Sequence, residues 1–208
     1  MEAIMYMHNP VREKFRDAVA KLGKVTSVHF DFSQLSSKYP AYQRGELPNI
    51  FNPAFATGGL MDLGIYCVYP AIDIFGVPDE ITAKSVFLDS GADGCGSVIF
   101  TYSDKVATFT YSKLAQDTAG SQILGDKGTL KIASISKLTG MELTAENGEK
   151  YSVHGDTPKA ELMGYEAAAF EGFIAGENRE KYALSSKMAL QVSRAMKTIR
   201  ESAGIRFN

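Results

Sequence analysis

The sequence predicts an α+β domain built on an open, mostly antiparallel β-sheet with helices on one face. Seven short apolar runs follow one another between residues 80 and 153, separated by glycine-rich and charged spacers that are typical of hairpin turns. Patterns with a helical period flank this region over 10–22, 59–75, 160–175 and 184–203. Helices at both ends of one antiparallel sheet are characteristic of the α+β class.

The segments before residue 57 predict a helix, a strand and a long loop. Apolar residues recur at helical spacing between Pro10 and Gly23, and KVTSVHFDFSQL then alternates apolar and polar residues like a strand with one solvated face. Residues 36–56 contain three prolines and one glycine and show no period. We expect a loop of about twenty residues there, and loops of that length inside a domain are usually functional.

The remaining elements follow from the same signals. The strand candidates are ITAKSVFLD, GSVIFTYSD, VATFTYSKL, SQILG, GTLKIA, MELTA and EKYSV. Their short spacers predict a meander of antiparallel hairpins, in a sheet of six or seven strands. We expect the last helix, over about 184–203, to open with a serine cap and to end at Gly204.

The composition is that of an ordinary globular protein. The 208 residues are 45% hydrophobic and 22% charged, with a formal net charge of −2, which favours neither nucleic acid nor an anionic membrane as a partner. No apolar run approaches the about 20 residues of a membrane span. Cys67 and Cys95 have no metal-ligand spacing, so we expect reduced core thiols, no metal site and a cytoplasmic protein.

The segment TGGLMDLGIY, residues 57–66, is the strongest candidate for a site. Asp62 and Tyr66 are four residues apart on a predicted helix and therefore share one face, among apolar neighbours. A buried carboxylate is costly unless it has a partner. Either Asp62 caps the first turn while the Tyr66 hydroxyl packs on a backbone carbonyl, or the two residues bind a substrate; the residues alone leave both interpretations open.

Four segments, in order along the chain, resemble the C-terminal domain of one enzyme family. They are EAIMYMHNP, NPAFATGGLMDLGIYCVYPAIDIFG, QILGDKGTLKI and FEGFIAGENREKYALSSKMALQVSRAMKTIRESAG. The family is that of glucose–fructose oxidoreductase and inositol dehydrogenase (Gfo/Idh/MocA). The resemblance covers essentially residues 1–208, and the tyrosine in GG-x-x-D-x-G-x-Y resembles the sugar-oxidoreductase and dihydrodiol-dehydrogenase branches.

The resemblance implies a two-domain enzyme of which this chain is the second domain. An N-terminal Rossmann domain would carry the glycine-rich dinucleotide loop and a catalytic lysine in an E-K-P segment, and neither motif is present in these 208 residues. NAD or NADP would therefore bind mainly outside this chain, which by itself would be inactive. The resemblance also implies a homo-oligomer that associates through the sheet, with residues such as Ile99 and Phe109 facing a twofold partner or a covering helix.

The resemblance further implies roles for six residues. Asp62 and Tyr66 would be catalytic, and because the reference pKa of tyrosine is near 10, Tyr66 would need a neighbouring cation to act as a base. Gly58 and Gly59 would let substrate and nicotinamide approach the helix start, although turn glycines explain them equally well. Tyr6 and His8 would contact the substrate, with ordinary packing as the alternative.

Three functions follow from these expectations. The first is the C-terminal domain of an NAD(P)-dependent oxidoreductase that transfers a hydride between the nicotinamide and a sugar, polyol or diol. The second is a non-catalytic regulator that senses a nucleotide or sugar, and the third is a stand-alone dimerisation module of the same fold. The intact D-x-x-x-Y pattern favours the enzyme.

Overall fold

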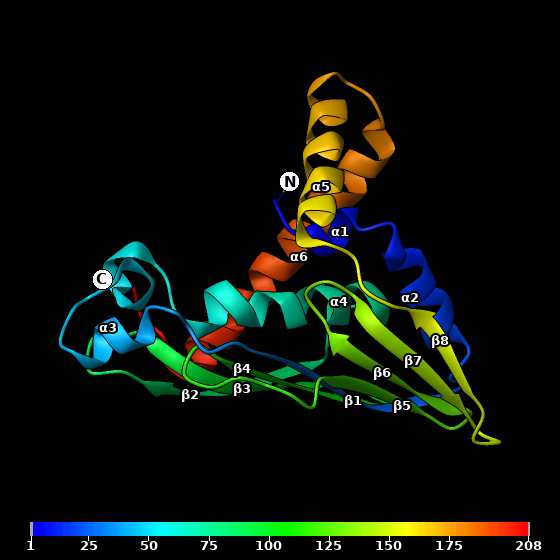
Figure 1. Ribbon diagram of the computed structural model, residues 1–208, viewed down its shortest axis with the longest axis horizontal. Coiled ribbons are helices and arrows are strands. Elements are labelled where there is room, and N and C mark those ends of the chain that lie inside the picture. Colours follow the sequence, from blue (N-terminus) through cyan, green and yellow to red (C-terminus); the bar gives the residue numbers. More distant parts are fainter. Residues whose placement is uncertain (1, 208) are drawn as a thin grey trace.

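One eight-stranded sheet forms the base of the molecule, and helices stand over one of its faces (Figure 1). The computed structural model describes residues 2–207. The strands are β1 (Val25–Ser33), β2 (Glu80–Phe87), β3 (Asp93–Thr101), β4 (Val106–Ser112), β5 (Ser121–Gly125), β6 (Gly128–Ser134), β7 (Thr139–Ala145) and β8 (Lys150–His154). Their order across the sheet is β2-β3-β4-β1-β5-β6-β7-β8. The α+β class and the open, mostly antiparallel sheet are thus confirmed.

The sheet is not the simple meander that the hairpin spacing predicted. All seven apolar runs between 80 and 153 are strands, but β1 is inserted between β4 and β5 and runs parallel to β4. Phe30 of β1 pairs with Phe109 of β4, so residues far apart in sequence share the centre of the sheet. A strand insertion of this kind depends on non-local pairing, which turn signals between consecutive strands do not encode.

The helices are α1 (Met5–His8), α2 (Val11–Ala20), α3 (Tyr39–Gln43), α4 (Ile65–Phe75), α5 (Lys159–Ile174) and α6 (Arg179–Ala203), and a π-helical turn, Leu60–Gly64, leads into α4. The predicted loop over 36–56 holds α3 and two short 3₁₀ turns. Gly204, with a φ of 77°, ends α6 as predicted. The predicted serine cap is wrong, because α6 begins at Arg179, well before the serines.

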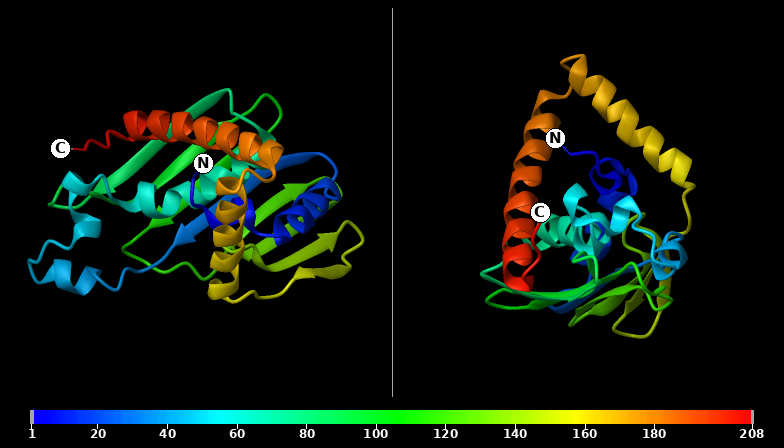
Figure 2. Two further views of the ribbon diagram at one scale, coloured as in Figure 1. Left: turned by 90° about the horizontal axis from the view of Figure 1, so that it is seen from above. Right: turned by 90° about the vertical axis from the view of Figure 1, so that its left-hand side faces the viewer.

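Figure 2 shows how the helices are arranged above the sheet. The α4 helix lies on the sheet, and the C-terminal part of α6 lies beside it, over β2. The α5 helix and the start of α6 stand away from the sheet and meet at their tips, with α1 between them.

Aromatic side chains form the centre of the layer between sheet and helices. The rings of Phe30 and Phe109 stack with centroids 6.0 Å apart, and Phe100 meets Phe109 edge to face at 4.7 Å. Such pairs add to the stabilisation that comes from burying their area. Cys67 is fully buried in this layer, whereas Cys95 is partly exposed, so only one of the two predicted core thiols is in the core.

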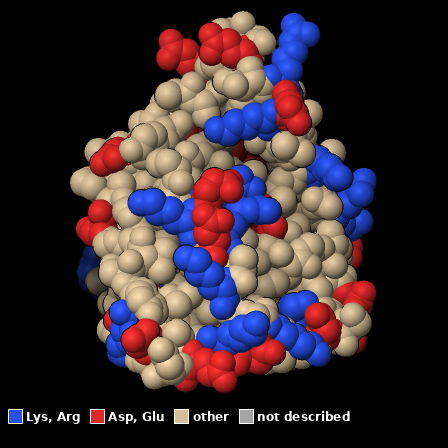
Figure 3. Space-filling model, turned by 90° about the vertical axis from the view of Figure 1, so that its right-hand side faces the viewer, with Lys and Arg blue, Asp and Glu red and all other residues tan. Residues whose placement is uncertain are grey.

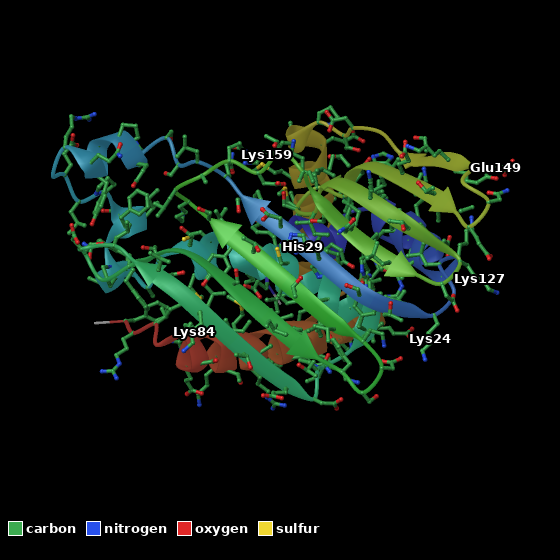
Figure 4. All side chains as sticks on the ribbon, turned by 90° about the horizontal axis from the view of Figure 1, so that it is seen from below. Lys24, His29, Lys84, Lys127, Glu149 and Lys159 are labelled. Carbon is green, nitrogen blue, oxygen red and sulfur yellow. The ribbon has the colours of Figure 1, made fainter. Side chains whose placement is uncertain are left out.

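The opposite face of the sheet is open in the described part of the chain, and His29 lies near its middle (Figure 4). Strand alternation places the two residues that were expected to face a twofold partner or a covering helix on opposite faces: Phe109 is 1% exposed on the helix side, whereas Ile99 is 42% exposed on the open face. Of the two, Ile99 alone is available to a sheet-to-sheet partner.

One segment, Pro53–Phe75, is long and apolar enough by composition to cross a membrane, with a mean hydropathy of 1.2. The sequence predicted no apolar run close to the length of a membrane span, and this segment differs from that expectation. In the structure 61% of its most apolar window is buried against the rest of the molecule, as in the central helix of many globular domains.

Candidate functional site

Asp62 and Tyr66 line a cavity of about 540 Å³ at the start of α4. Asp62 lies in the π-helical turn, where its N–H donates to the carbonyl of Gly58 at 3.2 Å, and Tyr66 lies in the first turn of α4. Single π-helical turns occur frequently at functional sites. The structure therefore brings the two predicted catalytic residues together on one wall.

The capping carboxylate of this helix is Asp93 and not Asp62. Asp93, at the first position of β3, accepts a hydrogen bond at Oδ2 from the N–H of Leu60 at 2.7 Å. Asp93 is completely buried, and burial raises its pKa to about 6, despite the opposing effect of that hydrogen bond. The interpretation of Asp62 as the helix cap is thus wrong, since Asp93 from β3 caps the helix.

Asp62 instead forms an ion pair with Lys113, a residue that the sequence analysis missed. The Lys113 Nζ lies 2.7 Å from Asp62 Oδ2, and the lysine side chain is only 8% exposed. Lys113 directly follows β4, in which Phe109 and Tyr111 face the helices. The same alternation places Lys113, two residues after Tyr111, on the inner face of the sheet. This period-two pattern is the feature of the sequence from which a buried Lys113 could be predicted.

Tyr66 is half-buried and has an edge-to-face contact with Phe32, with ring centroids 5.4 Å apart. Among residues 2–207 its hydroxyl has no hydrogen-bond partner, so the predicted contact with a backbone carbonyl is not formed. Burial raises the pKa of Tyr66 above its usual 10, and the nearby carboxylates of Glu166 and Asp62 raise it further. The phenol is therefore protonated in this chain and can donate a hydrogen bond into the cavity.

The rest of the cavity wall mixes apolar residues with polar ones and carries charges of both signs. It comes from the end of β1, the segment after β4, the turn after β6 and the start of α5. The polar residues on it are Asp31, Ser33, Gln34, Gln116, Asp117, Ser134, Ser136, Lys137 and Lys159. A wall with this many donors and acceptors suits a ligand rich in hydroxyl groups.

Gly58 and Gly59 do not line this cavity. A Cβ on Gly58, whose φ is 152°, would lie 1.9 Å from the Asp93 carboxylate, and a Cβ on Gly59 would lie 2.9 Å from the ring of Tyr111. Protein atoms thus lie where side chains on these two residues would point, and the approach of substrate and nicotinamide stays a prediction. Both glycines are explained by close packing of the helix start on β3 and β4.

Tyr6 does not line the cavity either. Its ring is fully buried, and its hydroxyl donates a hydrogen bond to Asp73 at 2.6 Å. Arg12 and Arg16 bind the same carboxylate, with nitrogen–oxygen distances of 2.9 Å. On this side of the molecule basic side chains gather around acidic ones (Figure 3). This cluster joins α1, α2 and α4, and the substrate contact of Tyr6 stays a prediction.

His8 is also buried, with its ring packed edge to face against Phe170 and Phe173 of α5. Burial, together with the nearby charge of Lys181, lowers the pKa of His8, so the imidazole is neutral near pH 7. It lies outside the cavity wall, and the structure gives the predicted substrate contact of His8 no support.

Comparison with known proteins agrees with the resemblance noted in the sequence. Residues 13–131 match the model of the GFO/IDH/MocA C-terminal domain. The chain is 31% identical over 205 residues to scyllo-inositol 2-dehydrogenase (NADP(+)) IolU of Bacillus subtilis, covering 99% of this chain and 62% of that protein. It is 30% identical over 155 residues to mouse trans-1,2-dihydrobenzene-1,2-diol dehydrogenase, covering 72% and 43%.

Solved structures show the same fold at low sequence identity. The 3-ketoreductase KijD10 from Actinomadura kijaniata, in complex with NADP, aligns with a TM-score of 0.74 at 17% identity, covering 98% of this chain and 60% of that one. The chain thus spans less than two thirds of the length of the relatives that it matches. On the matched domain and this similarity, the chain belongs to the Gfo/Idh/MocA family of oxidoreductases, in the region of its C-terminal domain.

Proposed function

We propose that this chain is the substrate-binding half of an NAD(P)-dependent oxidoreductase that acts on a CH–OH group of a sugar, polyol or diol. Asp62 and Tyr66 would contact the reacting end of the substrate in the cavity at the start of α4. One observation carries this proposal: the helix is capped by Asp93, which leaves Asp62 free of that structural duty and turned toward the cavity beside Tyr66.

Hydride transfer from a carbinol carbon requires the hydroxyl proton to leave as well, and the reverse reaction requires a proton donor. The protonated Tyr66 hydroxyl suits the donor role when a carbonyl is reduced. In the oxidative direction the same residue would need a cation that lowers its pKa. The lysine that the family carries on its dinucleotide-binding domain is our candidate for that cation.

The bound nicotinamide would supply or accept the hydride. The sequence contains no G-x-G-x-x-G segment, so these residues offer no loop for the dinucleotide phosphates. We therefore place the cofactor site on an upstream Rossmann domain and expect the 208-residue chain alone to be inactive. By their names, the two sequence relatives reported above act on an inositol and on a diol, which supports a small hydroxylated substrate.

The test is a pair of isosteric substitutions in the full-length protein. A panel of inositols, sugars and diols with NAD and NADP first identifies a substrate. Tyr66→Phe removes only the hydroxyl, and we expect kcat to fall by about 10²- to 10⁴-fold, the usual contribution of a positioned acid or base. Asp62→Asn keeps the shape and should lower kcat/KM.

Melting temperatures measured on the same preparations provide the control. Because the Tyr66 hydroxyl has no partner within the described residues, its removal should change the free energy of unfolding by less than about 1 kcal/mol. Normal turnover by a well-folded Tyr66→Phe enzyme would refute the proposed role. Saturable binding of substrate and cofactor with no turnover would instead favour a sensor.

A further inference from the structure

Beyond the two predicted residues, the structure points to a third. We propose that Lys113 is a positioning residue of the site, which holds one oxygen of Asp62 so that the other oxygen can accept a hydrogen bond from a substrate hydroxyl. The inference rests on the proposed function and deepens it.

The main chain of Lys113 is fixed on both sides. Its N–H donates to the carbonyl of Gly94 at 2.8 Å, and its carbonyl accepts from the N–H of Ser36 at 2.9 Å. These bonds continue the pairing of β4 with β3 and with the segment after β1 beyond the end of the strand. The side chain therefore starts from a rigid part of the sheet, as precise positioning requires.

The ion pair is buried on one side and open on the other. The Lys113 side chain is 8% exposed, whereas that of Asp62 is 30% exposed and lines the cavity. Within the described residues Asp62 is the one carboxylate in ion-pair contact with Lys113. A buried ammonium without a partner is costly, so the lysine strongly favours the conformation of Asp62 in which Oδ2 faces it.

This geometry leaves Oδ1 for the ligand. No hydrogen bond or ion pair joins Oδ1 to another residue in 2–207. A carboxylate held at one oxygen is already oriented, so a hydroxyl that binds the other oxygen does not have to order it. Lys113 thus acts on the substrate through Asp62 and does not touch the reacting atoms itself.

The experiment uses single and double variants of the full-length enzyme with the substrate found by the panel. Lys113→Met should lower kcat/KM by about 10- to 100-fold, by analogy with residues that orient the side chains bound to a metal. The KM for the substrate should rise while the KM for the cofactor stays unchanged. Lys113→Arg keeps the charge and should recover most of the loss.

Non-additivity separates positioning from a general structural effect. Because Lys113 acts through Asp62, the double variant Asp62→Asn/Lys113→Met should be no less active than Asp62→Asn alone. The matched control is Lys105→Met, because Lys105 is also a largely buried lysine in an ion pair, with Asp104, at the other end of β4. That variant should keep full activity.

Wild-type kcat/KM in a folded Lys113→Met enzyme would overturn the inference, and so would additive losses in the double variant. Should the methionine variant fail to fold, Lys113→Gln keeps a donor and should still lose about 10-fold, so full activity there also overturns it. Full activity of the Asp62→Asn enzyme would refute the proposed function itself. Low activity of the Asp62→Asn enzyme together with full activity of the Lys113 variant would refute only the inference about Lys113.

Discussion

Two carboxylates lie beside the start of α4, and their surroundings differ. Asp93 is completely buried and caps the helix, whereas Asp62 is paired with Lys113 and reaches the cavity. Burial disfavours the charged form of a carboxylate, which explains why the pKa of Asp93 rises to about 6. At the scale of single residues, the surroundings thus make Asp93 a structural residue, whereas Asp62 remains available to a ligand in the cavity.

The raised pKa of Asp93 predicts a pH-dependent stability. The folded-state value of about 6 exceeds the unfolded value of 3.8, so the stabilising contribution is full below pH 3.8 and is lost as the pH rises through 6. This loss amounts to about 3 kcal/mol between pH 3.8 and 7. Asp93→Asn keeps an acceptor for Leu60 and removes the titration.

Urea unfolding of both proteins at pH 4.5 and pH 7 measures this effect. The difference in the free energy of unfolding, variant minus wild type, should rise by about 2 kcal/mol between pH 4.5 and pH 7. The reason is that only the wild type has to bury an ionised carboxylate at the higher pH. Parallel pH dependences of the two proteins would show that Asp93 does not titrate in this range.

At the scale of elements, one buried carboxylate joins three helices. Asp73 of α4 binds the hydroxyl of Tyr6 from α1 and the guanidinium groups of Arg12 and Arg16 from α2. Burial alone would raise the pKa of Asp73, but the hydrogen bonds from Arg12 and Tyr6 outweigh it and the pKa is lowered. The short α1 helix is thereby tied to the helix that carries the site.

Tyr6→Phe tests whether this residue is structural or binds substrate. The substitution removes one hydrogen bond to a charged group and keeps the ring, so stability should fall by about 1.5–3 kcal/mol. Because Tyr6 lies outside the cavity wall, KM and kcat of the full-length enzyme should stay within about twofold of wild type. A raised KM at an unchanged melting temperature would instead support the substrate contact of Tyr6 that the resemblance implied.

At the scale of the whole molecule, no other element among residues 2–207 covers the open face of the sheet. The exposed apolar side chains of Val86, Ile99 and Val106 lie on this face, on the adjacent strands β2, β3 and β4. These three side chains are spaced along the strands, and an uncovered sheet face that carries them is a candidate interface. We therefore keep the prediction that two copies associate through their sheets.

Ile99→Lys places a charge in the middle of that surface and should convert a dimer to a monomer in light scattering, because an unpaired charge in an interface is strongly unfavourable. Leu190→Lys is the matched control, since Leu190 is 61% exposed but lies on α6, on the helix side of the molecule. It should leave the dimer intact. A monomeric wild-type protein at high concentration would contradict the prediction.

Local sequence was sufficient to predict most elements. The period-two runs became the strands, the helix before Gly76 ends where predicted, and Asp62 and Tyr66 line one wall, as their spacing of four residues predicted. These features depend on neighbours within a few residues, which a pattern records directly.

The remaining features depend on residues far apart in the chain, and only the tertiary structure decided them. The insertion of β1 beside β4, the capping of α4 by Asp93 and the pairing of Asp62 with Lys113 each join segments separated by 30 to 80 residues. The same holds for the hydrogen bond between Tyr6 and Asp73. Burial and partner choice are properties of the packed molecule, so residue type and spacing alone could not assign them.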